Sequence, residues 1–126
     1  MESLRILIVD DEPELVSALQ ERLSLRGFST RGVTDGAAAL ACLAEEPFDV
    51  VLADVKMPGL GGLDLVRTIK LERPNVPVVL LTGHSSAQDA ANGSTLGAFE
   101  YLMKPVKIDE LVRVLRAAVA RGEVEQ

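Results

Sequence analysis

The stretch from Phe48 to Gly62 reads Phe-Asp-Val-Val-Leu-Ala-Asp-Val-Lys-Met-Pro-Gly-Leu-Gly-Gly and decides the fold. Its apolar run, Val50 to Leu52, is typical of a strand that is buried on both faces of a sheet. Asp54 stands where that run ends, and Pro58 with the glycines after it predicts a loop. A carboxylate therefore lies at the C-terminal end of a buried strand, which is the edge where open α/β sheets bind ligands.

Composition limits the classes of protein that this chain can represent. The 126 residues fit one domain, 1–126, and the net charge of −6 argues against direct contact with nucleic acid. Cys42 is the one cysteine, which excludes an internal disulfide, suits a reducing cytoplasm and is expected to be a small core residue. No apolar run has membrane-spanning length, and residues 1–5 lack a signal-peptide layout. We therefore expect a cytoplasmic location and no membrane contact.

Predicted strands and helices alternate along the chain. The expected strands are Leu4–Val9, Phe28–Val33, Phe48–Asp54, Val76–Leu81 and Ala98–Met103. The expected helices begin at Pro13, at Thr34 or Asp35, at Gly62, at Ser85 and near Ile108, and the last one frays from Gly122. Alternation of this kind predicts right-handed βαβ crossovers and a parallel sheet covered by helices on both faces. The mixed polarity of residues 28–33 places that strand near an edge.

Five polar residues are predicted to lie just past the ends of these strands. They are Asp10, Asp11, Asp54, Thr82 and Lys104. Because the carboxyl ends of parallel strands meet at one edge, these distant residues should form a single site. Each of them alone would be read as a solvated loop residue, but that reading is much weaker for five residues at consecutive strand ends.

The chemistry of such a site follows from its charges. Three carboxylates repel one another unless a cation joins them, and oxygen ligands suit Mg²⁺. Lys104 adds a positive charge for a phosphoryl group, and Thr82 offers a hydroxyl donor. An aspartate in these surroundings can attack phosphorus and form an acyl phosphate.

Other patterns carry weaker signals. Gly59-Leu-Gly61-Gly62 opens a helix, but no Gly-Lys-Ser/Thr follows, so a turn is favoured over a phosphate-binding loop. His84 is the one histidine, so a histidine-based metal site is unsupported. Tyr101 lies in a predicted strand, where it serves either core packing or a role as a movable aromatic residue.

Four short motifs, taken in order and spacing, resemble the receiver domain of bacterial two-component response regulators over essentially the whole chain. They are Val9-Asp10-Asp11-Glu12, Asp54 with Met57-Pro58-Gly59, Leu81-Thr82-Gly83, and Tyr101-Leu-Met-Lys104-Pro105. The resemblance implies a (βα)5 flavodoxin-like fold with strand order 2-1-3-4-5. It also implies a regulatory domain that supports only its own phosphorylation and dephosphorylation, rather than an enzyme.

The resemblance also implies roles for individual residues. Asp54 would be the phosphoacceptor, and Lys104 would pair with the phosphoryl group. Mg²⁺ (or Mn²⁺) would be bound by Asp11, Asp54 and the backbone carbonyl of Lys56, with Asp10 contributing through water.

Two further pairs of residues take their expected roles from the same family. Thr82 and Tyr101 would be the switch pair that relays phosphorylation to the output surface. Lys56 and His84 would tune the phosphoryl lifetime, and we expect a fairly long one because neither side chain is suited to orient an attacking water.

The expected partners follow from the resemblance as well. The phosphoryl donor would be a phosphohistidine on a sensor histidine kinase or phosphotransfer protein. An output domain or a second copy would dock through the fourth helix, the last strand and the last helix. The sequence Thr-Gly-His at residues 82–84 most resembles the corresponding sequence in receivers of regulators with transcriptional output.

Two alternatives are weighed against this interpretation. A Mg²⁺-dependent phosphatase with an aspartyl nucleophile often carries a second aspartate two residues later, where this chain has Lys56. Such an enzyme also needs room for a substrate-selecting cap, and we expect none in this chain. A flavodoxin-like FMN binder needs a Ser/Thr-rich phosphate loop after the first strand, whereas this chain has Asp-Asp-Glu at residues 10–12.

The fourth predicted helix has weak helical propensity. Gly93 costs about 1 kcal/mol relative to alanine in a helix interior. Asn92 and Ser94 offer competing side-chain hydrogen bonds to the backbone. We therefore expect residues 85–96 to be short, frayed or mobile before phosphorylation.

Overall fold

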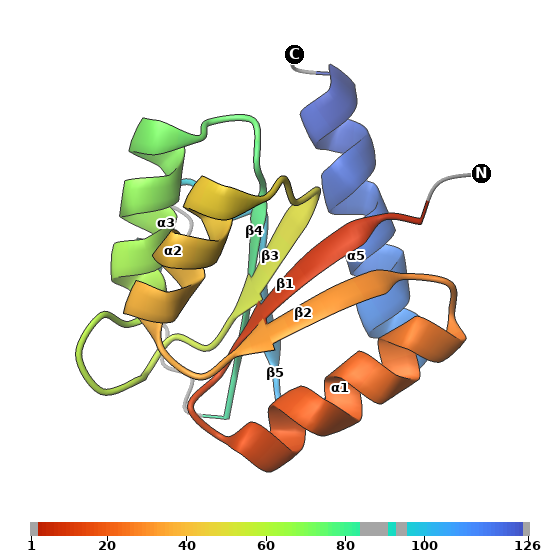
Figure 1. Ribbon diagram of the computed structural model, residues 1–126. Helices are drawn as coiled ribbons and strands as arrows, with labels where there is room; N and C mark the ends of the chain where they lie inside the picture. The colour runs from red at the N-terminus through yellow and green to blue at the C-terminus, as the bar shows by residue number, and fades with distance from the viewer. Residues whose placement is uncertain (1–2, 84–90, 93–95, 125–126) are drawn as a thin grey trace.

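The computed structural model describes residues 3–83, 91–92 and 96–124. In this part of the chain, five strands form one parallel sheet with the order β2-β1-β3-β4-β5 (Figure 1). The strands are β1 (Arg5–Val9), β2 (Ser29–Val33), β3 (Val50–Ala53), β4 (Val78–Thr82) and β5 (Glu100–Met103). The helices are α1 (Pro13–Leu25), α2 (Gly36–Glu45), α3 (Gly62–Glu72) and α5 (Ile108–Val124). The predicted fold class and strand order are confirmed, and β2 is an edge strand as expected.

Helices cover both faces of the sheet. The side chains of each strand alternate between the two faces, and both faces carry apolar residues that the helices bury. Ile6 and Ile8 of β1 face α1 and α5, whereas Leu7 and Val9 face α2 and α3. Figure 1 shows the two helix pairs on opposite sides of the strands. Each face has its own buried cluster, and the expected core position of Cys42 is confirmed at 5% exposure.

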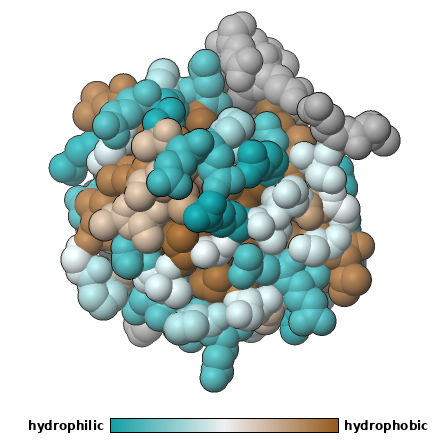
Figure 2. All heavy atoms as spheres, viewed as in Figure 1, coloured by the Kyte–Doolittle hydropathy of each residue, from teal (hydrophilic) through white to brown (hydrophobic). Residues whose placement is uncertain are grey.

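Helix α2 is unusually apolar on its outer side. Its exposed positions include Ala37, Ala41 and Ala44, and Figure 2 shows pale brown apolar colour over this part of the molecule. Asp35 begins this helix, since its carboxylate accepts a hydrogen bond from the N–H of Ala38 at 2.7 Å. Of the two capping residues that the sequence allowed, Asp35 is therefore the one used.

Some boundaries differ from the predictions. The strands begin one or two residues later than expected. Thr82 is the last residue of β4 rather than a residue past its end, because it still pairs with Met103 of β5. The expected fraying of the last helix is wrong for residues 122–124, which are helical. Arg121 in that last turn suits the negative end of the helix and lies over the ring of Phe99 at 5.8 Å.

The helix expected over residues 85–96 falls mostly outside the described residues, so its predicted weakness stays a prediction. Among the helices of the described ranges, none has the length and apolar character needed to cross a membrane.

Candidate functional site

Two buried carboxylates lie side by side at the carboxyl edge of the sheet. Asp10 follows β1 and Asp54 follows β3, and they are 3% and 6% exposed. Their positions are set by the backbone: the N–H of Asp10 donates to Val33 at 3.2 Å, and that of Asp54 donates to Val9 at 2.9 Å. The ladder of central strands therefore brings together two acids that are 44 positions apart in the sequence.

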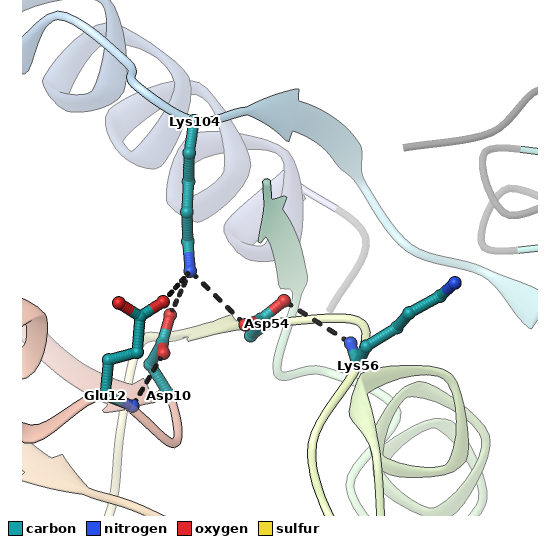
Figure 3. Close-up of polar contacts among 5 residues, drawn as sticks. All are labelled: Asp10, Glu12, Asp54, Lys56 and Lys104. Atoms are coloured by element: carbon teal, nitrogen blue, oxygen red, sulfur yellow. Dashed lines mark hydrogen bonds and ion pairs between the residues drawn. The ribbon is translucent and has the colours of Figure 1, made fainter. Parts of the chain in front are cut away.

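Lys104 reaches these acids from the end of β5. Its backbone N–H donates to the carbonyl of Thr82 at 2.8 Å, which holds it beside β4. Its Nζ lies 2.7 Å from Asp10 Oδ2, 3.2 Å from Asp54 Oδ2 and 3.4 Å from Glu12 Oε1 (Figure 3). The structure thus brings the predicted lysine and two predicted aspartates into direct contact.

The loop after β3 holds Asp54 from the other side. Its Oδ1 accepts a hydrogen bond from the N–H of Lys56 at 3.3 Å, while Figure 3 shows the Lys56 side chain directed away from the carboxylate. Helix α3 begins against the same backbone, because a Cβ at Gly62 would lie 2.2 Å from the carbonyl oxygen of Asp54. Glycine at this position allows α3 to pack on the peptide unit that carries Asp54.

Burial and neighbouring charges raise the pKa of two groups in the site, Asp10 and Lys104. Burial raises the pKa of Asp10, and the nearby Asp54 charge adds to this, while hydrogen bonds from Lys104 and Glu12 only partly offset it. Burial alone would lower the pKa of Lys104, but the hydrogen bond to Asp10 and the charges of both aspartates outweigh it and raise that pKa. Lys104 is therefore held as a cation within a site that disfavours a further negative charge.

Four carboxylates form a cluster that can hold a metal ion. Within the described residues, Asp10, Asp11, Glu12 and Asp54 each place an oxygen within 4.8 Å of the others. Asp11 and Glu12 are exposed, so the cluster opens to solvent on one side. All of these donors are hard oxygen atoms, and such a donor set fits Mg²⁺ or Mn²⁺ rather than a thiolate-binding or imidazole-binding metal.

The remaining predicted residues lie on β4, on β5 or outside the described part of the chain. Thr82 is fully buried beside the site, and Tyr101 is partly buried against the α2–α3 core cluster. The core-packing interpretation of Tyr101 is therefore confirmed, while its role in a switch stays a prediction. His84 lies outside the described residues.

Sequence reasoning missed Glu12 as a participant in the site. Glu12 is the third of the acids at residues 10–12, but the sequence alone indicates no role for it. The structure places its carboxylate within reach of Lys104, on the solvent side of the two buried aspartates. The available signal was the run of three acids, which a turn leading into a helix can direct to a common point.

Comparisons with known proteins agree with this geometry. Residues 6–116 match the family described as response regulator receiver domain. The chain is 40% identical over 121 residues to the DNA-binding response regulator MtrA of Mycolicibacterium smegmatis, covering 96% of this chain and 53% of that protein. It is 36% identical to the DNA-binding transcriptional regulator NtrC of Escherichia coli K12, covering 96% of this chain and 26% of that protein. The chain therefore spans about half, or about a quarter, of the length of these relatives.

Solved structures give the same assignment. A CheY-like receiver domain protein from Methanospirillum hungatei superposes with a TM-score of 0.93 at 27% identity, covering 99% of this chain and all of that one. A receiver domain protein from Clostridium thermocellum gives 0.92 at 33% identity, with 98% and 99% of the two chains covered. The phosphatase alternative finds no support in these comparisons. Fold, site and sequence together show that this chain belongs to the response regulator receiver domain family.

Proposed function

We propose that Asp54 is the phosphoacceptor of this receiver domain. The observation that carries the proposal is the position of its carboxylate, which is buried at the sheet edge with Lys104 Nζ 3.2 Å away and three other acids around it. Attack by a carboxylate on phosphorus needs two things: the negative charge of the phosphoryl oxygens must be compensated, and the orientation of the carboxylate must be fixed. Lys104 supplies the first, and the hydrogen bond from the Lys56 N–H contributes to the second.

The donor in this proposal is a phosphohistidine on a sensor histidine kinase or a phosphotransfer protein. An oxygen of Asp54 attacks the phosphorus atom, the phosphorus–nitrogen bond to the imidazole breaks, and the leaving imidazole takes a proton from solvent. The product is an acyl phosphate on Asp54. Lys104 would then pair with the phosphoryl oxygens, which takes its ammonium away from the acids that hold it beforehand.

The acid cluster would hold Mg²⁺ or Mn²⁺ through Asp11, Asp54 and the Lys56 carbonyl, with Asp10 acting through water. The bound ion would offset negative charge on the transferring phosphoryl group. The position of the Asp54 carboxylate does not depend on the ion, because backbone hydrogen bonds tie Asp10 and Asp54 to neighbouring strands. This arrangement supports a dependence of phosphorylation on a divalent cation.

The consequence of phosphorylation would be a change of surface. In this proposal Thr82, fully buried at the end of β4, and Tyr101 on β5 relay the change toward an output domain or a second copy, through the fourth helix, β5 and α5. The relatives' names, DNA-binding regulators, support a transcriptional output, and a cytoplasmic location agrees with such a role. The influence of Lys56 and His84 on phosphoryl lifetime remains part of the proposal.

The test uses a small phosphodonor and intact-protein mass spectrometry. Wild type incubated with acetyl phosphate and Mg²⁺ should gain one phosphoryl group, and chelation of the metal should prevent it. Asp54→Asn should gain none. Asp64→Asn, which neutralises an exposed aspartate in the first turn of α3, is the matched control and should behave as wild type. Labelling of Asp54→Asn at the wild-type rate would overturn the proposal.

A further inference from the structure

Glu12 occupies the start of α1 without acting as a conventional cap. Among the described residues, its side chain makes no capping hydrogen bond to the helix, although side chains at this position commonly do so. The backbone serves instead: its N–H donates to Asp10 Oδ1 at 3.0 Å, and its carbonyl accepts from Val16 at 3.1 Å. Pro13 at the first helical position fixes the chain direction here. The Glu12 carboxylate is thus left for another contact.

That contact is with Lys104. Figure 3 shows the Glu12 carboxylate directed toward the ammonium from the opposite side to Asp54, and the two atoms lie 3.4 Å apart. The three carboxylates around this ammonium differ in burial, since Asp10 and Asp54 side chains are 4% and 7% exposed and Glu12 is 66% exposed. Glu12 therefore draws the ammonium toward the rim, while Asp54 draws it inward.

We propose that Glu12 is a positioning residue: together with Asp10 and Asp54 it holds the Lys104 ammonium in its unphosphorylated position, and this tether from the rim of the site must break when a phosphoryl group arrives. This inference rests on the proposed function of Asp54. The tether is an interaction of the unphosphorylated state, because an ammonium that pairs with a phosphoryl group on Asp54 has to move away from Glu12. An interaction lost on the way to the transition state slows the reaction.

Three variants separate the tether from its charge. Glu12→Gln removes the charge and the ion pair. Glu12→Asp keeps the charge but shortens the side chain by one methylene, which breaks a contact that already lies at the limit of hydrogen-bond distance. Glu14→Gln removes an exposed charge from the first turn of the same helix and serves as the matched control.

The first readout needs neither metal nor donor. In ¹⁵N-lysine-labelled protein, the ammonium protons of Lys104, assigned from their absence in Lys104→Met, should exchange with water faster in Glu12→Gln and Glu12→Asp than in wild type. Glu14→Gln should match wild type. Equal exchange in all four proteins would overturn the tether.

The second readout is the initial rate of phosphorylation by acetyl phosphate at saturating Mg²⁺. Loss of an exposed ion pair corresponds to about a two- to fivefold change, so both Glu12 variants should be faster than wild type by that factor. A Glu12→Asp rate equal to wild type, or an equal acceleration in Glu14→Gln, would overturn the inference in favour of a general charge effect. Failure of Asp54 as the acceptor would appear separately, as labelling of Asp54→Asn, and would leave the exchange measurement unchanged.

Discussion

The two ends of the sheet carry charges in opposite arrangements. At the amino end, Arg5 and Arg31 both pair with Glu46, and Asp49 accepts a hydrogen bond from the Arg5 backbone N–H at 2.8 Å. At the carboxyl end, four carboxylates lie together, and three of them contact the ammonium of Lys104 (Figure 3). Charges are balanced at the amino end, whereas negative charge is in excess at the carboxyl end.

Burial sharpens the difference. The paired side chains at the amino end are 21–49% exposed, so their ion pairs contribute little to stability, and breaking one should lower the free energy of unfolding only slightly. At the carboxyl end, the side chains of Asp10, Asp54 and Lys104 are 4–16% exposed, so each charge depends on its neighbours for compensation. The charges of the amino end need no further ion to balance them. The carboxyl end lacks positive charge, which fits a site that is completed by a cation and a phosphoryl group.

The largest expected effect comes from removing the cation of the carboxyl end. Lys104→Met keeps the length of the side chain but leaves Asp10 and Asp54 buried without their ammonium. We expect the free energy of unfolding to fall by about 2 kcal/mol without divalent cations, less than for a fully buried pair because Lys104 keeps some contact with water. Chemical denaturation monitored by circular dichroism would measure it.

The control for this variant is Lys107→Met, which removes an exposed lysine just before α5. Its expected effect is below 0.5 kcal/mol, as for most surface substitutions. Because the pKa of Lys104 is raised in the folded protein, its contribution is present at neutral pH and is lost only as the pH rises through that value. Mg²⁺ should recover part of the loss in Lys104→Met. Equal stability of the two lysine variants would contradict the comparison between the ends.

The arrangement of the sheet could be predicted because its central strands have a local signature. The run Val50 to Leu52 is apolar throughout, and these residues are at most 1% exposed, as a strand covered on both faces requires. The end of β4 could not be predicted in the same way. Thr82 belongs to that strand because it pairs with Met103, and a pairing partner 21 positions away leaves no mark on the local sequence.

A smaller effect, of opposite sign, is expected from Asp10→Asn. The substitution removes one buried negative charge while leaving Asp54 to pair with Lys104. Replacement of buried charges by neutral groups is often stabilising, and we expect a gain of about 1 kcal/mol without divalent cations. Asp11→Asn removes the same charge from an exposed side chain and should give a smaller gain.

The pH dependence of this gain has a defined sign. Burial raises the pKa of Asp10, so the folded state takes up this proton before the unfolded state does. Wild type therefore gains stability from this group as the pH falls through its folded-state pKa toward the ordinary value of 3.8, while the asparagine variant cannot. The difference in unfolding free energy between the two proteins should be largest at neutral pH and shrink on acidification. A difference that grew on acidification would mean that Lys104 overcompensates Asp10.

The carboxyl-end site itself was predictable only in part. Asp10, Asp54 and Lys104 could be placed together because each follows a strand of a parallel sheet. The contact of Glu12 could not, since it depends on how the turn into α1 directs one long side chain. Between Thr34 and Asp35, both good caps by residue type, the choice depends on which oxygen reaches the N–H of Ala38.

The smallest expected effect lies at the amino end. Arg31→Gln removes one of the two cations that pair with Glu46, but Arg5 remains and its guanidinium lies over the ring of Phe48 at 5.2 Å. Glu46 is therefore left with a partner rather than with an uncompensated charge. We expect a loss of no more than about 0.5 kcal/mol, and one that decreases as salt is added, because exposed pairs are screened.

The double variant Arg5→Gln with Arg31→Gln sharpens this prediction. It leaves Glu46 without either arginine, but Glu46 is 21% exposed and can take up water in their place. The combined loss should therefore stay below that of Lys104→Met, although two cations are removed instead of one. If the double variant were the less stable protein, the charges of the amino end would contribute as much as those of the carboxyl end. The proposed difference between a complete and an incomplete cluster would then be wrong.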